Sequence, residues 1–382
     1  MKILHTSDWH LGTIVLVQSM LDDQRYFIEN VFLKALDEYR PDVIVLAGDI
    51  FDRSIAPIPA IELFEDTLYA VAQRHIPLIA ISGNHDSPER LIPAARLLRS
   101  SEIYLANSIQ DFFEPIDISS SDGSRARFFC LPYFDLSAAK HFLGNDEIKN
   151  ANEAYQALFE AARDRLSDDC PNILVTHCTV TGNITTCKSE SAISVGGAQQ
   201  VSSDLFRMFD LTCLGHIHSP QSAGGNARYC GAPLRYSFDP NERDKHMLLI
   251  DTDNGMSVTG IPVAPRREMR TIQGSFDELY SVPDNYSEDY IYAIVDDDHI
   301  IFEPMTRLRE KYPNILNLEQ LYLTRVIESD DTDGIRQKMA ANAITDEEIM
   351  TSFLTYICKT QPSDGDVEFF NAIIKRIGDD VI

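Results

Sequence analysis

Five short polar motifs constrain this 382-residue chain more than any other feature, because each lies where a strand-like apolar run ends. Runs such as 43–46 and 78–81 are followed within a few residues by Asp, Asn or His. The motifs are Asp8-Trp9-His10, Gly48-Asp49, Gly83-Asn84-His85-Asp86, Thr176-His177 and Gly215-His216-Ile217-His218. Side chains two apart on an extended chain point the same way, so Asp8 and His10 form a pair. Polar groups beyond the ends of buried strands predict an enzyme with a metal-dependent active site.

Each motif alone has an ordinary structural explanation. A Gly-Asp pair after a strand is common turn chemistry, and a buried Asp or His is often a satisfied core residue. Five of the ten histidines nevertheless fall in these motifs. A purely structural origin would require the same coincidence in five separate places, so we predict a metal site.

The predicted ligands are too many for one ion and suit two. They are two carboxylates, one amide and four imidazoles, namely Asp8, Asp49, Asn84, His10, His177, His216 and His218. Two cations roughly 3.5–4 Å apart clamp a phosphate and activate a water between them. Asp49 is the expected bridge because it is the lone ligand of its motif. Mixed oxygen and nitrogen ligation without thiolate favours Mn²⁺, Fe²⁺ or Zn²⁺ over Mg²⁺ or Ca²⁺.

His85 is predicted to be the catalytic residue rather than a ligand. Its neighbour Asn84 is the expected ligand, which leaves this imidazole free to face the substrate. A histidine near a metal-bound phosphate can donate a proton to the leaving alkoxide. Asp86 is the residue that we expect to orient the ring.

In order and spacing, these motifs resemble those of the calcineurin-like metallophosphoesterases. Within that superfamily, residues 1–12 (MKILHTSDWHLG) and 229–238 (YCGAPLRYSF) are similar to SbcD, a family of bacterial nuclease subunits. The resemblance is strong over about residues 1–270 and weak beyond them.

The resemblance implies a ligand set for each of the two ions. One ion would be held by Asp8, His10, Asp49 and His218, and the other by Asp49, Asn84, His177 and His216. His85 would be the proton donor, and Mn²⁺ is the ion that we expect. This assignment agrees with the one made from the residues.

The pattern of apolar residues predicts an α/β fold in two domains with a helical tail. Helices are expected over 22–39, 60–73, 88–98 and 153–166, whereas strands dominate after residue 205. The resemblance implies a two-sheet metallophosphoesterase sandwich flanked by helices in residues 1–268. A small α+β module at 270–343 would be the capping domain, and the tail at 345–382 would bind a partner.

Charge and composition bear on the partners. The chain has 33 basic and 59 acidic residues, a net charge of −26, which argues against tight DNA binding by this chain alone. The resemblance implies DNA as substrate, an SbcC-type coiled-coil ATPase as partner, and a homodimer formed by the helices at 60–73 and 88–98. Seven cysteines without a Cys-x-x-Cys pair indicate a reducing compartment, so we expect a cytoplasmic protein without signal segment or membrane span.

Three functions remain open from the sequence. The leading one is a Mn²⁺-dependent exonuclease and endonuclease subunit that processes double-strand ends and hairpins. A small-molecule phosphodiesterase or phosphatase with the same centre is the second, although it would need neither the second domain nor the tail. A metal-free scaffold is the third, and the complete ligand set disfavours it.

Overall fold

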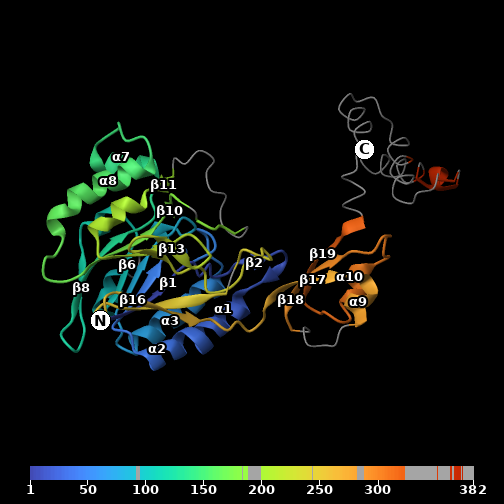
Figure 1. Cartoon of the computed structure of the whole chain (residues 1–382), viewed down its shortest axis with the longest axis horizontal. Coiled ribbons are helices and arrows are strands. Elements are labelled where there is room, and N and C mark those ends of the chain that lie inside the picture. Colours follow the sequence, from blue (N-terminus) through green and yellow to red (C-terminus); the bar gives the residue numbers. More distant parts are fainter. Residues whose placement is uncertain are drawn as a thin grey trace. The chain divides into compact units, whose positions relative to one another are not determined.

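Two six-stranded sheets form the centre of the larger of the two units into which the chain folds (Figure 1). Unit 1 comprises Met1–Met269 and unit 2 comprises Arg270–Ile382. The computed structural model describes residues 1–91, 95–182, 184–187, 199–242, 244–281, 288–322, 351, 362–363, 365–370 and 372. Each unit has a hydrophobic core of its own.

The first sheet has the strand order β16-β15-β1-β4-β5-β6. Its last four strands are parallel, and β15 and β16 are antiparallel additions at one edge. The bounds are β1 Lys2–Thr6, β4 Val43–Ala47, β5 Leu78–Ile81, β6 Ile103–Ala106, β15 His246–Asp251 and β16 Ser257–Pro262. Because β1, β4 and β5 are parallel neighbours, the first three motifs emerge at the same edge of this sheet.

The second sheet has the order β13-β14-β12-β9-β8-β7. Its four inner strands are parallel, and the two outer ones are antiparallel to their neighbours. The bounds are β7 Ile116–Ser119, β8 Arg125–Leu131, β9 Asn172–His177, β12 Leu211–Gly215, β13 Gln221–Gly224 and β14 Ala227–Tyr229. The other two motifs therefore end neighbouring strands, β9 and β12.

The inner strands β4, β9 and β12 are buried along their length because both of their faces are covered. Every residue of β4 is buried, as expected for a parallel strand with layers on both sides. Val45 and Ala47 of β4 share a core cluster with Val175 of β9 and Cys213 of β12, so this cluster lies between the sheets. The predicted α/β two-sheet fold is thus confirmed.

Helices cover the outer face of the first sheet, and one of them differs from the prediction. The sequence predicts a regular helix over 22–39, whereas the structure has α1 Leu21–Phe27, a π-helical turn Ile28–Phe32 and α2 Leu33–Tyr39. Phe27 and Phe32, five residues apart, both pack edge-on against Trp9, with ring centroids 5.8 and 5.1 Å away. A π-helical turn brings residues five apart onto one face, which places both rings on the tryptophan of the first motif.

The remaining helices of unit 1 are close to their predicted positions. The helix α3 spans Ile58–Ala72, and α8 spans Ala151–Ala162 before a 3₁₀ turn at Arg163–Arg165. The predicted helix at 88–98 corresponds to α4 Pro88–Leu91 and α5 Ala95–Leu98, and 92–94 lie outside the described residues. Shorter elements are β2 Ile14–Val15, β3 Gln18–Ser19, α6 Ile109–Phe112, α7 Leu136–Leu143, β10 Thr179–Val180 and β11 Gln200–Val201.

Unit 2 contains a three-stranded sheet with two short helices. The strands β17 Met269–Gly274, β18 Tyr290–Val295 and β19 Ile315–Gln320 lie in that order in the sheet, with α9 Phe276–Ser281 and α10 Pro304–Leu308 beside them. The sequence predicts the last strand at 318–323, whereas it begins and ends three residues earlier. The tail predicted at 345–382 lies mostly outside the described residues. In the described part of the chain, no helix has both the length and the hydropathy that a membrane crossing requires.

Candidate metal centre

The predicted ligands converge from five strand ends in the two sheets. Asp8 and His10 follow β1, Asp49 follows β4, and Asn84 follows β5. The other three come from the second sheet: His177 is the last residue of β9, and His216 and His218 follow β12. The two edges meet at a hydrogen bond, because the Nδ1 of His177 lies 2.9 Å from the carbonyl oxygen of Ala47. All seven predicted ligands thus lie in one cluster of motifs.

The backbone at these positions is unusual. Four of the predicted ligands have a positive φ angle: 54° at Asp8, 45° at His10, 48° at Asp49 and 99° at His216. Left-handed conformations of residues other than glycine cost of order 1–3 kcal/mol each and cluster at functional sites. At these four positions the placement of the side chain offsets the strain of the backbone conformation.

Glycines in the motifs allow the two sheets to approach closely. A Cβ atom on Gly215 would lie 1.8 Å from the carbonyl oxygen of Ala47. A Cβ on Gly83 would lie 2.1 Å from the Oδ1 of Asp49, and a Cβ on Gly48 would lie 2.3 Å from the Nδ1 of His177. Each of these glycines leaves room for a predicted ligand or for the strand that carries one.

The first ligand group consists of Asp8, His10 and His218. Their ligand-type atoms lie within 4.8 Å of one another, and all three side chains are buried. The Nε2 atoms of His10 and His218 are 3.0 Å apart. Asp8 is held by the hydroxyl of Ser7, which donates to its Oδ2 at 2.6 Å, and by the amide of His216, which donates to its Oδ1 at 2.8 Å.

The second ligand group consists of Asn84, His177 and His216. The Oδ1 of Asn84 lies 3.0 Å from the Nε2 of His177 and 3.0 Å from the Nδ1 of His216. Because the Nδ1 of His177 faces the Ala47 carbonyl, it carries the hydrogen, and its Nε2 is left as the ligand atom.

Asp49 lies between the two groups. Its Oδ2 is 3.5 Å from the Nε2 of His10 and 3.3 Å from the Nε2 of His177. Its Oδ1 accepts a hydrogen bond from the backbone amide of His85 at 2.9 Å, which fixes the carboxylate. One carboxylate oxygen thus faces ligands of both groups, as a bridging ligand must.

The electrostatics of the cluster favour positive charge. Burial alone would lower the pKa of His177, but the carboxylates of Asp49 and Asp8 raise it to about 9, so a metal ion would have to displace the proton from its Nε2. Burial lowers the pKa of His10 to about 4 and that of His216 to about 3, so both imidazoles are neutral with lone pairs available. Buried carboxylates and neutral imidazoles with converging lone pairs fit divalent metal ions by the chemistry of their donor atoms.

His85 lies beside the first ligand group. Its ring packs edge-on against that of His10, with centroids 4.8 Å apart. Its Nδ1 is 2.7 Å from the backbone carbonyl of Asp52, so this carbonyl orients the ring. The expectation for Asp86 is corrected, because its carboxylate accepts hydrogen bonds from the amides of Ile50, Phe51 and Gly83 and thereby shapes the loops.

Two further residues hold the first motif, and sequence reasoning missed both. The side chain of Gln24 donates to the carbonyls of Trp9 and His10 at 3.2 and 2.7 Å and accepts from the amide of Gly12 at 2.9 Å. It also donates to the hydroxyl of Tyr236 at 3.0 Å, and that hydroxyl donates to the carbonyl of Trp9. For Gln24, the only hint in the sequence is its place in the first turn of the helix predicted at 22–39.

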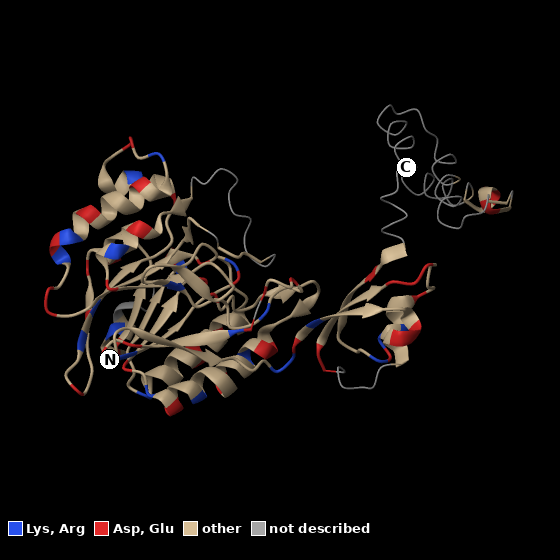
Figure 2. Ribbon diagram, in the orientation of Figure 1, with Lys and Arg blue, Asp and Glu red and all other residues tan. Residues whose placement is uncertain are grey.

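Acidic residues are spread over helices and loops of both units, while the strands of the two sheets carry few charges (Figure 2). Several basic side chains of unit 1 are engaged by carboxylates, among them Arg74 with Asp37 and Arg127 with Asp117. Among the described residues, charged side chains thus lie mainly on the helices and loops rather than on the strands of the two sheets.

Comparisons with known proteins agree with this centre. Residues 1–220 match the family described as calcineurin-like phosphoesterase, and residues 265–356 match the type 5 capsule protein repressor C-terminal domain. The SbcD subunit of the SbcCD nuclease of Staphylococcus epidermidis is 32% identical over 327 residues, covering 84% of this chain and 86% of that protein. Its namesake from Staphylococcus saprophyticus is 32% identical over 324 residues, covering 83% of this chain and 84% of that protein.

Proposed function

Because this chain belongs to the SbcD family of calcineurin-like phosphoesterases, we propose that it is the metal-dependent nuclease subunit of an SbcC-SbcD-type complex. It hydrolyses DNA phosphodiester bonds as exonuclease and endonuclease and processes double-strand ends and hairpins. Mn²⁺ is the proposed ion.

The observation that carries this proposal is the position of Asp49. A single oxygen of this carboxylate faces both ligand groups, at 3.5 Å from His10 and 3.3 Å from His177. We assign Asp8, His10, Asp49 and His218 to one metal, which we name site A. We assign Asp49, Asn84, His177 and His216 to the other, which we name site B. Two such cations, when bound, polarise the phosphate, lower the pKa of a water and stabilise the charge of the departing oxygen.

His85 is proposed as the proton donor. The Asp52 carbonyl at its Nδ1 fixes a tautomer with the hydrogen on that nitrogen when the ring is neutral. A ring held in this way next to His10 directs its Nε2 to the substrate side of the site. In the imidazolium form this nitrogen also carries a proton, which it can give to the leaving oxygen while the ring returns to the neutral Nδ1–H tautomer.

The net charge of the chain and its family both bear on the proposed partner. The net charge of −26 argues against tight DNA binding by this chain alone, because most DNA affinity derives from basic side chains. We propose that the SbcC-type coiled-coil ATPase supplies that affinity and that the tail at 345–382 binds it. Residues 270–343 are the proposed capping domain.

We also propose a homodimer formed by the helices at 60–73 and 88–98, to which α3 contributes an exposed stripe beside its buried face. Phe64, Leu68 and Val71 are buried in the chain's own core. Beside this buried face, Ile58 is 70%, Ile61 39% and Tyr69 69% exposed. This exposed stripe at helical spacing is the proposed contact.

One assay tests the function. Duplex and hairpin DNA are incubated with the purified chain and Mn²⁺, with and without a co-expressed ATPase partner, and Asp49→Ala serves as the inactive control. The expected result is Mn²⁺-dependent cleavage that the partner increases. Hydrolysis of small phosphodiesters without any DNA cleavage, even with the partner present, would instead identify a small-molecule phosphodiesterase.

A further inference from the structure

A buried ion pair lies behind site A and contacts the main chain of one of its ligands. Glu242 and Lys245, both buried, follow the segment after β14, and the Nζ of Lys245 lies 3.0 Å from the Oε1 of Glu242. The same ammonium donates to the backbone carbonyl of His218 at 2.9 Å. We propose that Lys245 is a positioning residue that holds His218 in place for the metal of site A, an inference that rests on the proposed function.

The carboxylate of Glu242 fixes the other end of this segment. Its Oε1 accepts from the backbone amide of Tyr236 at 3.1 Å. Its Oε2 accepts from the amide and the hydroxyl of Ser237 at 3.0 and 2.7 Å. One carboxylate thus closes the loop from Tyr236 to Glu242 and presents an oxygen to the ammonium of Lys245.

Tyr236 links this loop to the first motif. Its ring packs edge-on against both His10 and His218, with centroids 5.8 and 6.3 Å away. Its hydroxyl donates to the carbonyl of Trp9, next to His10. The loop held by Glu242 and Lys245 therefore contacts His10 and His218, two of the four residues assigned to site A. Among the contacts described for this loop, none is made with His177 or Asn84 of site B.

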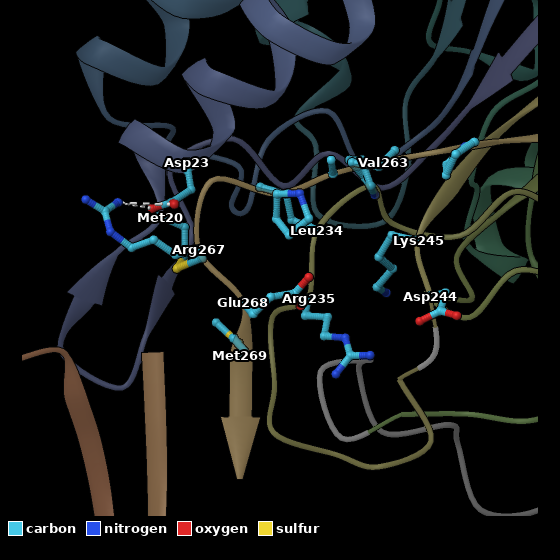
Figure 3. A pocket seen from close by; sticks show the side chains of 14 residues that line it. Met20, Asp23, Leu234, Arg235, Asp244, Lys245, Val263, Arg267, Glu268 and Met269 are labelled. Atoms are coloured by element: carbon cyan, nitrogen blue, oxygen red, sulfur yellow. Dashed lines mark hydrogen bonds and ion pairs between the residues drawn. The ribbon is translucent and has the colours of Figure 1, made fainter. Parts of the chain in front are cut away.

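The surroundings of Lys245 argue that its role is specific. A cavity of about 420 Å³ borders this side chain, so its stem does not fill a closed core (Figure 3). A buried ion pair is seldom more stabilising than a well-packed apolar pair. A donor that reaches a ligand carbonyl, however, cannot be replaced by packing. Partners behind metal ligands commonly contribute 10–100-fold to metal affinity.

The test is Mn²⁺ titration calorimetry of the full chain, with no turnover involved. The wild-type chain is expected to bind two ions, and Lys245→Ala is expected to weaken one of them about 10–100-fold while the other is unchanged. His216→Ala should weaken the other ion instead. Arg267→Met is the matched control, because Arg267 borders the same cavity and its described ion pair is with Asp23 rather than with a proposed ligand. It should bind both ions as the wild type does.

The open cavity permits a chemical rescue. Propylammonium replaces the atoms that Lys245→Ala removes, and it should restore the weakened ion, whereas tetramethylammonium, which has the charge but no N–H donor, should not. Lys245→Arg should retain both ions. If Lys245→Ala does not fold, the double variant Glu242→Gln with Lys245→Met removes both charges at similar volume, and it should show the same loss of one ion.

Three results would overturn the inference. Two ions bound to Lys245→Ala at wild-type affinity would show that the contact is dispensable. Equal weakening of both ions, shared with Arg267→Met, would show general loosening of the fold. If propylammonium and tetramethylammonium restored binding of the weakened ion equally, the positive charge of Lys245 rather than its hydrogen bond to His218 would explain the loss. A wild-type chain that binds fewer than two ions would instead contradict the proposed function itself.

Discussion

At the scale of single residues, the two carboxylate oxygens of Asp49 have different roles. Its Oδ1 is fixed by the amide of His85, and its Oδ2 faces both ligand groups. Although burial alone would raise the pKa of Asp49, His177 and then His10 hold it well below the usual range. The carboxylate is therefore ionised and oriented before any ion arrives.

Asp49→Ala should lose both metals and all hydrolysis while the fold survives, because the bridging oxygen disappears without disturbing the strands. Elemental analysis of the purified variant measures the metals, and circular dichroism checks the fold. Two metals still bound to the folded variant would contradict a bridging role.

His85→Ala should keep both metals and lose most nuclease activity. General acid catalysis is typically worth about 10²–10⁴-fold, so a fall of that size is expected in the single-turnover rate constant for cleavage of duplex DNA. Asp86→Asn is not a suitable control, since Asp86 shapes the loops. Cleavage at the wild-type rate would remove His85 from the mechanism.

The clustering of the proposed ligands could be predicted from the sequence, but the groups that orient them could not. Each ligand type stands next to a strand end with Gly, Asp or His beside it, and this local pattern is visible in one dimension. The carbonyl of Asp52 and the amide contacts of Asp86 are main-chain interactions, which residue types do not reveal. Lys245 acts on His218 from 27 residues away, so no spacing rule points to it.

At the scale of elements, regular strands with continuous apolar runs were predictable. The β4 and β12 runs are buried on both faces and were located within a residue. The π-helical turn at Ile28–Phe32 was not, because its cause is the tertiary contact of Phe27 and Phe32 with Trp9 rather than local propensity.

The close approach of β4 and β12 gives a prediction for Gly215. In Gly215→Ala, the new Cβ would lie 1.8 Å from the Ala47 carbonyl oxygen, so the two strand ends must separate. We expect a loss of about 1–3 kcal/mol in the free energy of unfolding together with weaker metal binding. Urea denaturation measures the first and Mn²⁺ titration the second. The matched control is Gly260→Ala in β16, an exposed glycine without a positive φ, where the nearest atom to the new Cβ is 3.4 Å away.

At the scale of the whole molecule, we propose that the chain depends on another protein for DNA affinity. The net charge of −26 argues against tight DNA binding by this chain alone, and the sequence of the tail at 345–382 predicts amphipathic helices too short to be stable alone. Deleting residues from Thr345 onward should abolish co-purification with the ATPase partner, while Mn²⁺-dependent hydrolysis of a small chromogenic phosphodiester persists. Unchanged complex formation would show that the tail does not recruit the partner.

The proposed dimer has its own test. Ile61→Glu places a charge in the centre of the exposed stripe of α3, so the variant should be monomeric in light scattering at micromolar concentration where the wild type is dimeric. Glu62→Gln, on the same helix, is the conservative control and should remain dimeric. A monomeric wild type would contradict the dimer.

The origin of the ligands in both sheets has a consequence during protein synthesis. Asp8 and His218 are 218 − 8 = 210 residues apart, and Lys245 follows still later. At about 5–20 residues per second, roughly 10–40 s pass between translation of the first ligand and the last. The growing chain is therefore inert toward nucleic acid, including the messenger being read, until nearly all of unit 1 has been synthesised.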